Sequence, residues 1–256
     1  MAKPLEVPVF SPSSAHAAIR LGASRIEYNA SGSYAEGGLT PTRLADLEAF
    51  ASSSVPLRIM IRPRGPPSAP EPDFVYSDQE FTLMKDDLSC FTESKHLSVD
   101  RGDGFVFGIL KASQAGGMTV DIERNKALVQ QARPYRCVFH RAFDDIIGSS
   151  SSSIKPWKEA LEDVIACGFD AILTSGGPGR APDNIDTVKE IITAAKGRIE
   201  IIVGGGVRSQ NIRLLARSVG EDHRLWFHSS CLTRSSGSEV DEEEVQAIIR
   251  QLEHTC

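Results

Sequence analysis

The stretch Tyr135-Arg136-Cys137-Val138-Phe139-His140-Arg141-Ala142-Phe143-Asp144 runs from a short apolar segment directly into ionisable side chains. An apolar run rich in aromatic and β-branched residues, followed by a loop and a helical pattern, indicates a buried parallel strand. In parallel α/β folds the carboxyl ends of the strands carry the functional site. We therefore expect His140, Arg141 and Asp144 to lie where a substrate or metal binds. The alternative is a structural ion-pair cluster that closes the barrel.

The same alternation of strand and helix occurs eight times along the chain. Besides the opening stretch, strands are expected at 5–9, 24–29, 55–61, 103–110, 170–174, 198–203 and 225–228. Helices are expected at 15–21, after Thr40-Pro41, from about Ser77-Asp78, and at 121–133, 156–167, 183–195, 209–217 and 241–253. Eight such units predict one (β/α)₈ TIM barrel over residues 1–256, with the Pro-rich loop 66–72 and the Ser-rich loop 149–153 as loop insertions.

Composition limits the classes of partner. The net charge is −6 and no Lys/Arg run is present, which argues against nucleic acid as a partner. No signal peptide and no membrane-spanning segment are evident, so we expect a protein of the cytoplasm that can also enter the nucleus, without a membrane partner. Five cysteines without CxxC spacing predict reduced thiols and no disulfides.

Side chains alternate along a strand, which predicts the faces of the barrel. Val138 and His140 should point toward the barrel axis, and Cys137 and Phe139 toward the helices. The same rule places Glu27 with Asn29 on one face of the second strand, while Glu6 can project inward from the first. Carboxylates inside a barrel need paired partners. We expect these partners to be Arg62, Arg64, Arg141 and His140, joined by His228.

Polar and glycine-rich segments follow the last three strands: Thr174-Ser175-Gly176-Gly177, Gly204-Gly205-Gly206-Val207-Arg208 and His228-Ser229-Ser230. Such loops of a TIM barrel often hold a phosphate on backbone N–H groups. Alternatively, the glycines only permit tight turns. The candidate anion-binding residues are Glu6, Arg62, Arg64, Arg141, Ser175, Gly204, Gly205, His228 and Ser229.

Proton transfer and metal binding are the two other kinds of chemistry that these residues allow. His140 with Asp144, or Glu27, could move protons as a general acid or base. His228 and Cys231 approach the same mouth and are the candidate metal ligands. The simpler interpretation of such a histidine is a hydrogen-bonded structural residue.

Several segments resemble, in order, the signature segments of the CutC copper-homeostasis family. They are Arg25-Ile26-Glu27, Glu36-Gly37-Gly38-Leu39-Thr40-Pro41, Met60-Ile61-Arg62-Pro63-Arg64-Gly65, Asp73-Phe74-Val75-Tyr76-Ser77-Asp78, Phe139-His140-Arg141-Ala142-Phe143-Asp144, Leu173-Thr174-Ser175-Gly176 and Phe227-His228-Ser229-Ser230. The resemblance implies a cytoplasmic TIM barrel linked to copper tolerance, trafficking or storage. It also implies a homo-oligomer, either a dimer or a tetramer, and Cu(I) as the bound ion.

This sequence departs from the family at two positions. Pro8 and Asn29 stand where Cu(I)-binding members are proposed to carry cysteines. Because Cu(I) prefers thiolate and thioether ligands, we expect copper binding here to be weak or indirect. The first hypothesis is thus a copper-homeostasis protein of the CutC type that binds copper or a small anionic ligand. The second is an enzyme acting on a small anionic or phosphorylated metabolite, and the third is a scaffold, which no residue favours.

Overall fold

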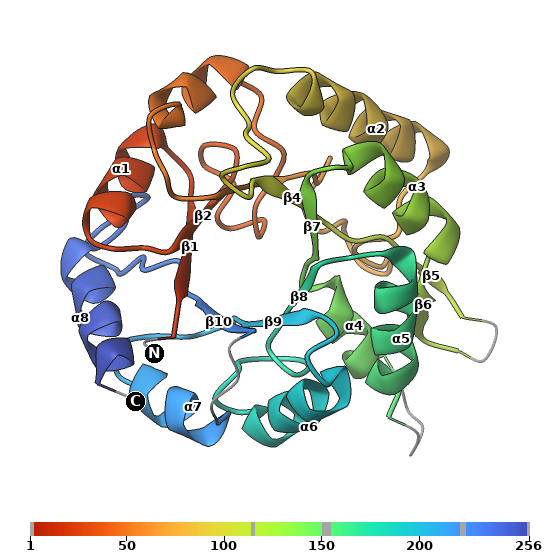
Figure 1. Ribbon diagram of the computed structural model, residues 1–256. Coiled ribbons are helices and arrows are strands. Elements are labelled where there is room, and N and C mark those ends of the chain that lie inside the picture. Colours follow the sequence, from red (N-terminus) through yellow and green to blue (C-terminus); the bar gives the residue numbers. More distant parts are fainter. Residues whose placement is uncertain (1–2, 114–115, 150–154, 221–223, 255–256) are drawn as a thin grey trace.

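The structure, a computed structural model, describes residues 3–113, 116–149, 155–220 and 224–254. Eight parallel strands close into a barrel, and helices surround it (Figure 1). This arrangement confirms the predicted TIM barrel. The barrel strands, in chain order, are β1 (Leu5–Val9), β2 (Arg25–Tyr28), β3 (Leu57–Met60), β4 (Gly104–Phe107), β7 (Arg136–Phe139), β8 (Ala171–Thr174), β9 (Glu200–Val203) and β10 (Leu225–His228). Each pairs in parallel with its neighbour, and β1 pairs with both β2 and β10.

Helices follow most strands at the predicted positions: α1 (Pro12–Arg20), α2 (Asp78–Thr92), α3 (Ile122–Ala132), α5 (Trp157–Cys167), α6 (Ile185–Ala195), α7 (Ile212–Ser218) and α8 (Glu242–Glu253). Several begin at a side chain that accepts a hydrogen bond from the first turn. Ser77 and Glu80 form a reciprocal capping box at α2, and Asp121 caps α3. Such caps satisfy backbone N–H groups that have no partner within the helix. None of the described helices is long and apolar enough to cross a membrane.

The structure differs from the sequence prediction in three elements. The prediction of an α-helix after Thr40-Pro41 is wrong. The chain forms only a 3₁₀ helix there, η1 (Leu44–Phe50), whose first turn has no side-chain cap. An additional helix, α4 (Ala142–Gly148), begins directly after β7, also without a side-chain cap. A small antiparallel hairpin of β5 (Leu110–Ala112) and β6 (Met118–Val120) follows β4.

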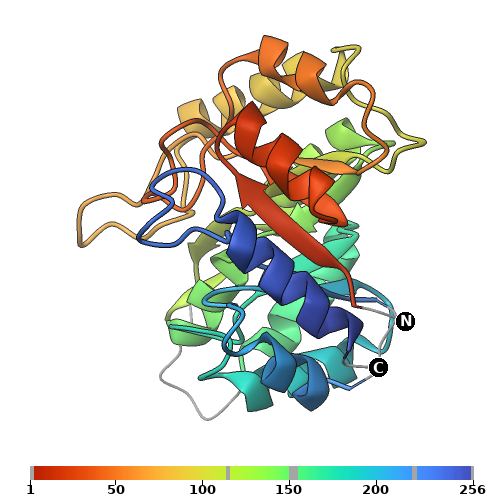
Figure 2. The same ribbon diagram turned by 90° about the vertical axis from the view of Figure 1, so that its left-hand side faces the viewer.

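The two predicted loop insertions are the Pro-rich loop 66–72 and the Ser-rich loop 149–153. Residues 66–72 contain no helix or strand, and this loop projects from the same end of the barrel as the blue loop after β10 (Figure 2). Of the Ser-rich loop 149–153, all but Ser149 lies outside the described residues.

The alternation of side chains along the strands divides the core as predicted. A large cluster between barrel and helices contains Cys137 and Phe139. A second, smaller cluster fills the barrel interior and contains Val138. Its other members are Met60, Val106, Ala171, Leu173 and Ile202, with Trp226 packed against them. This apolar cluster is built from β3, β4, β7, β8 and β9, whereas no member comes from β1 or β2.

Candidate functional site

Glu6 lies at the centre of a buried charge cluster inside the barrel. It is the direct cross-strand neighbour of Arg25, with which it forms an ion pair, and both side chains are almost fully buried. Arg25 also pairs with Glu200 at 2.8 Å and stacks on Trp226, 3.8 Å from the ring centroid. The other Glu6 oxygen lies 2.7 Å from Nδ1 of His228. Paired in this way, these charges can be held away from water.

The pairing fixes the ionisation of Glu6 and His228. Burial raises the pKa of the Glu6 carboxyl, but the charge of Arg25 and the hydrogen bond with His228 outweigh burial and lower that pKa to about 2. Burial lowers the pKa of His228, but the hydrogen bond with Glu6 and the charge of Glu27 outweigh it, so the net shift is upward. Glu6 is thus a carboxylate at neutral pH.

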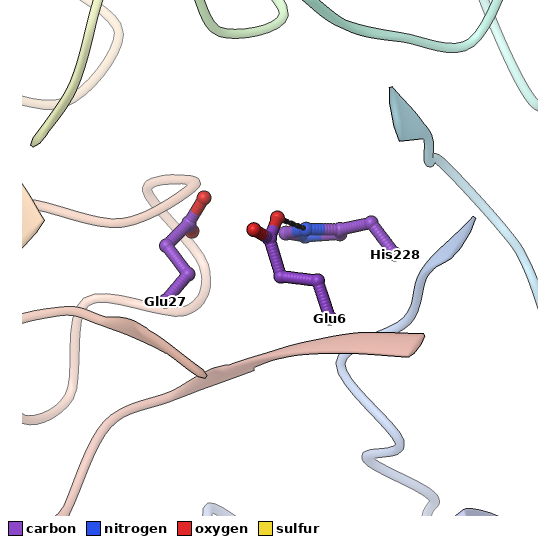
Figure 3. A group of neighbouring side chains, drawn as sticks. All are labelled: Glu6, Glu27 and His228. Carbon is purple, nitrogen blue, oxygen red and sulfur yellow. Dashed lines mark hydrogen bonds and ion pairs between the residues drawn. The ribbon is translucent and has the colours of Figure 1, made fainter. Parts of the chain in front are cut away.

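Glu27 faces the Glu6–His228 pair from β2 (Figure 3). Its Oε1 accepts a hydrogen bond from the Asn29 side-chain amide at 3.2 Å. Its Oε2 is buried and has no hydrogen-bond partner among the described residues. Burial raises the pKa of this carboxyl, and the nearby charge of Glu6 adds to the effect. Glu27 therefore has an open acceptor position inside the barrel.

A cavity of about 460 Å³ opens at the carboxyl ends of the strands. Its wall combines apolar side chains with acidic, basic and imidazole groups, as small-molecule sites do. The charged and polar side chains on this wall come from five of the strand ends and their loops, those of β2, β3, β7, β9 and β10. They are Glu27, Tyr34, Glu36, Arg62, Asp73, His140, Arg141, Asp145, Arg208, His228, Ser229 and Ser230.

Two of the three cavity arginines are neutralised by carboxylates. Arg62 pairs with Asp73 at 2.7 Å, and Arg141 pairs with Asp144 at 2.8 Å. Arg208 instead donates to the Val207 carbonyl at 2.7 Å and to the Ser229 hydroxyl at 3.2 Å. Within the described part of the chain, no carboxylate lies within ion-pair distance of Arg208. Its positive charge is therefore available to a ligand.

His140 lies on the cavity wall as a neutral imidazole. Burial, together with the nearby charge of Arg62, lowers its pKa to about 3. Nδ1 accepts a hydrogen bond from the Ala142 amide at 3.3 Å, so Nε2 carries the proton. Nε2 is buried and finds no acceptor among the described residues, and the ring packs against Phe74 at 4.6 Å between centroids. His140 can thus donate one hydrogen bond to a bound molecule.

Asp145 presents a second titratable group to the cavity. The residue as a whole is exposed, but its carboxyl contributes to the cavity wall. Partial desolvation there, with the charges of Asp73 and Asp144, raises its pKa to about 6. A carboxyl that titrates close to neutral pH suits proton transfer.

The predicted pairing of the interior carboxylates with strand-end arginines was largely wrong. Glu6 pairs with Arg25 rather than with Arg62, Arg64 or Arg141, whereas the predicted contact with His228 is confirmed. The physical reason is strand register. Arg25 lies directly beside Glu6 across the β1–β2 ladder, whereas the arginines at the strand ends reach acidic residues of their own loops.

Six predicted site residues, Cys231 among them, do not line the cavity as expected. Asp144 is buried, and its carboxylate holds the start of the loop after β8 by accepting hydrogen bonds from the Thr174 hydroxyl at 2.5 Å and the Ser175 hydroxyl at 2.7 Å. Arg64 pairs with Glu80 of α2 at 2.5 Å. Ser175 and Gly204 are buried behind the wall, and Glu6 lies below it.

Cys231, predicted as a metal ligand together with His228, packs in the core between barrel and helices. Its thiol donates to the Ser229 carbonyl oxygen at 3.5 Å, and burial raises its pKa to about 12. The predicted residues that do line the cavity are Glu27, Arg62, His140, Arg141, Gly205, His228 and Ser229.

Sequence reasoning missed Arg25, Asp73, Asp145 and Arg208 as site residues. Arg25 could have been found, because it lies two positions before Glu27 on β2 and its side chain therefore points to the same inward face. Arg208 follows the glycine run that was singled out. No such signal marked Asp145, because α4 itself was unexpected.

The fold and this cavity define the chain as a TIM-barrel protein with a charged ligand-sized mouth at the carboxyl ends of its strands. The CutC family model matches residues 4–231. The copper homeostasis protein cutC homolog of Mus musculus is 36% identical over 232 residues, which cover 91% of this chain and 74% of that protein. A CutC family protein of Vibrio cholerae is 34% identical over 218 residues, 84% of this chain and 76% of that protein.

Among solved structures, the CutC crystal structure from Streptococcus agalactiae matches with a TM-score of 0.69 and 27% identity. The match covers 88% of this chain and 98% of that one. This chain belongs to the CutC family, and the Mus musculus member named above is a copper homeostasis protein cutC homolog.

Proposed function

We propose that this CutC-family barrel works by binding a small anionic molecule at its mouth, and that its part in copper homeostasis does not depend on Cu(I) held by thiolates. The observation that carries the proposal is the cavity-lining Arg208, whose guanidinium has no carboxylate partner among the described residues. The other cavity arginines are paired with carboxylates, so the unpaired charge of Arg208 favours the binding of an anion.

The loop beside Arg208 adds backbone donors. Gly205 and Gly206 line the cavity, and their N–H groups donate to no described residue. Gly205 has φ +85°, and a Cβ there would come within 2.9 Å of the Ser175 side chain and 3.3 Å of the Arg141 guanidinium carbon. Only glycine thus lets this backbone lie so close to Arg141. Free N–H groups next to an arginine suit phosphate, sulfate or carboxylate oxygens.

The thiols offer little to Cu(I), which binds thiolates. Cys137, Cys167 and Cys231 are buried, and burial raises their pKa values to about 12, 11 and 12. Cys90 is exposed and far along α2 from the mouth, and Cys256 lies outside the described residues. Pro8 and Asn29, at the two inward positions on β1 and just after β2, supply no sulfur.

A second candidate, catalysis on the bound anion, is favoured by His140 and Asp145. Both line the cavity, one as a neutral donor with an unused N–H and the other as a carboxyl with a pKa near 6. A donor and a group that titrates near neutrality are what general acid–base catalysis requires. Turnover of a phosphorylated metabolite would then follow binding.

The test is a calorimetric titration of the tag-free protein with sulfate and with inorganic phosphate. We expect saturable binding, weakened about tenfold in Arg208→Gln because a charge-assisted hydrogen bond is lost. Arg213→Gln is the matched control, since Arg213 is exposed on α7 and lines no part of the cavity. Equal affinities in the two variants, or no saturable binding of either anion to the unaltered protein, would refute the proposal.

The family resemblance also leads us to propose a cytoplasmic homo-oligomer. Light scattering coupled to size-exclusion chromatography measures the particle mass, and a monomer at micromolar concentration would contradict this part.

A further inference from the structure

We propose that Glu6, Glu27 and His228 form a binding site for a divalent transition-metal cation inside the barrel, at the floor of the cavity. This site goes beyond the anion-binding function and is testable in the absence of any anion. Two of its members, Glu27 and His228, line the cavity, and the third lies between them (Figure 3).

The three side chains converge from adjacent strands. Glu6 is on β1, Glu27 on β2 and His228 on β10. Strand β1 lies between the other two and pairs with both. One potential ligand atom from each residue lies within 4.8 Å of the other two. A cation with ligand distances of about 2.0–2.2 Å would need only a small inward movement of these side chains. Ligands on strands are positioned more rigidly than ligands on loops.

Glu27 is the side chain whose contacts are incomplete. The residue is 4% exposed, and its Oε2 has no partner among the described residues. Leaving a buried carboxylate oxygen without a donor costs about 1–3 kcal/mol or more. Figure 3 shows its carboxylate directed toward the Glu6–His228 pair rather than away from it. A cation between the three residues would supply the missing partner.

His228 has a ring nitrogen to offer. Nδ1 lies 2.7 Å from the Glu6 carboxylate, and Nε2 makes no hydrogen bond to any residue in the described ranges. In the neutral tautomer with its proton on Nε2, Nδ1 carries the lone pair that a metal needs, and a cation then takes the place of the proton between Nδ1 and the Glu6 carboxylate.

The charges of the barrel interior point the same way. Three carboxylates, those of Glu6, Glu27 and Glu200, face two guanidinium groups, those of Arg25 and Arg58. In the form that a metal requires, with Glu27 ionised and the imidazole neutral, this group carries one net negative charge, which is costly away from water. A cation removes the excess. The competing arrangement is an imidazolium at His228, which would balance the charge but leave no lone pair for a metal.

The donor set selects the kind of cation. Two carboxylates and an imidazole suit Zn²⁺, Mn²⁺, Fe²⁺ or Co²⁺, whereas Cu(I) favours sulfur ligands. Three protein ligands with one side open to a cavity are typical of a metal that also contacts a bound molecule. An anion held by Arg208 could then reach the cation from above, but metal binding itself needs no anion.

The experiment titrates chelator-treated, tag-free protein with Zn²⁺ by calorimetry and with Co²⁺ by visible absorption, in buffer without sulfate or phosphate. We expect one ion per chain. Glu27→Gln and His228→Gln should each weaken binding by at least about 100-fold, since loss of even an outer-sphere partner costs about 10–100-fold. Glu200→Gln is the control: it removes the same charge from the same interior but lies outside the cluster.

Several outcomes would overturn the proposal. They are no 1:1 binding to the unaltered protein, undiminished binding in both cluster variants, or an equal loss in Glu200→Gln. Circular dichroism first establishes that each variant is folded. If a cluster variant does not fold, the absorption spectrum of Co²⁺ bound to the unaltered protein identifies the kind of ligand instead. Carboxylate and imidazole ligands give weak d–d bands only, and an intense near-ultraviolet thiolate-to-metal band would contradict the assignment. Sulfate binding to metal-free protein, measured separately, tests the anion proposal alone.

Discussion

The Glu6 carboxylate and the His228 imidazole lie 2.7 Å apart across the seam where the first and last strands of the barrel meet. The two residues are also register partners in the β1–β10 ladder, and Arg25 binds the other oxygen of the same carboxylate from β2. One side chain therefore connects three strands at the point where the chain closes on itself.

Removing this carboxylate should destabilise the fold. Glu6→Ala leaves Arg25 buried with only Glu200 as a partner, so we expect the free energy of unfolding to fall by about 3 kcal/mol or more. Urea denaturation measures it. The control is Glu162→Ala, which breaks an exposed Glu–Arg pair with Arg198 and should cost far less, because water screens an exposed pair. Equal losses in the two variants would contradict a structural role for Glu6.

His140 should make stability depend on pH. Its pKa is about 3 in the folded chain and about 6.5 when unfolded. The unfolded state therefore binds the proton first, so stability is complete above pH 6.5 and declines as the pH falls toward 3. Between pH 7 and pH 5 this group should remove about 2 kcal/mol. We expect the loss over that interval to be smaller by this amount in His140→Gln, measured by urea denaturation at both pH values. An unchanged pH dependence would mean that His140 is protonated in the folded state.

Asp145 should control anion affinity. Its pKa is raised to about 6, so the carboxyl becomes neutral as the pH falls from 7 to 5 and repels a bound anion less. Sulfate keeps its charge over this range, so its dissociation constant should decrease on acidification. In Asp145→Asn the affinity at pH 7 should equal that of the unaltered protein at pH 5 and should no longer vary. A variant that keeps the full pH dependence would assign it to another group.

The cysteines should differ sharply in reactivity. Thiolates react, and burial keeps Cys137, Cys167 and Cys231 protonated, whereas Cys90 is exposed. In a Cys256→Ser chain, a thiol reagent at pH 8 should modify one cysteine quickly and the other three only after urea is added. Mass spectrometry of the peptides would identify Cys90. Rapid modification of Cys231 in the folded protein would contradict its placement in the core.

The sequence predicted the barrel well because each strand ends at a clear change from apolar to polar residues. Alternation along the strands also predicted the inward direction of Val138 and the outward direction of Cys137, which need only the local period of two. Helix caps such as Ser77 with Glu80 marked helix starts in the same local way.

Features that depend on distant contacts were predicted poorly. The register between β1 and β2 determines which arginine lies beside Glu6. The strands of this barrel are mostly apolar, and no local sequence pattern predicts their register. Helix α4 lacks a capping side chain, so Asp144 was taken for a cavity residue although it is a buried brace, and Asp145 was missed. Whether Arg208 has a counter-ion is likewise visible only in three dimensions.

The most direct test of the central claim, that the polar mouth rather than a thiolate site is the functional centre, is an anaerobic Cu(I) competition titration. The purified, tag-free protein and its Cys231→Ala variant compete with a colorimetric chelator, because Cu(I) favours thiolates and burial keeps the Cys231 thiol protonated. We predict that neither form withdraws Cu(I) from the chelator. Tight, stoichiometric binding that is abolished by Cys231→Ala would contradict the account.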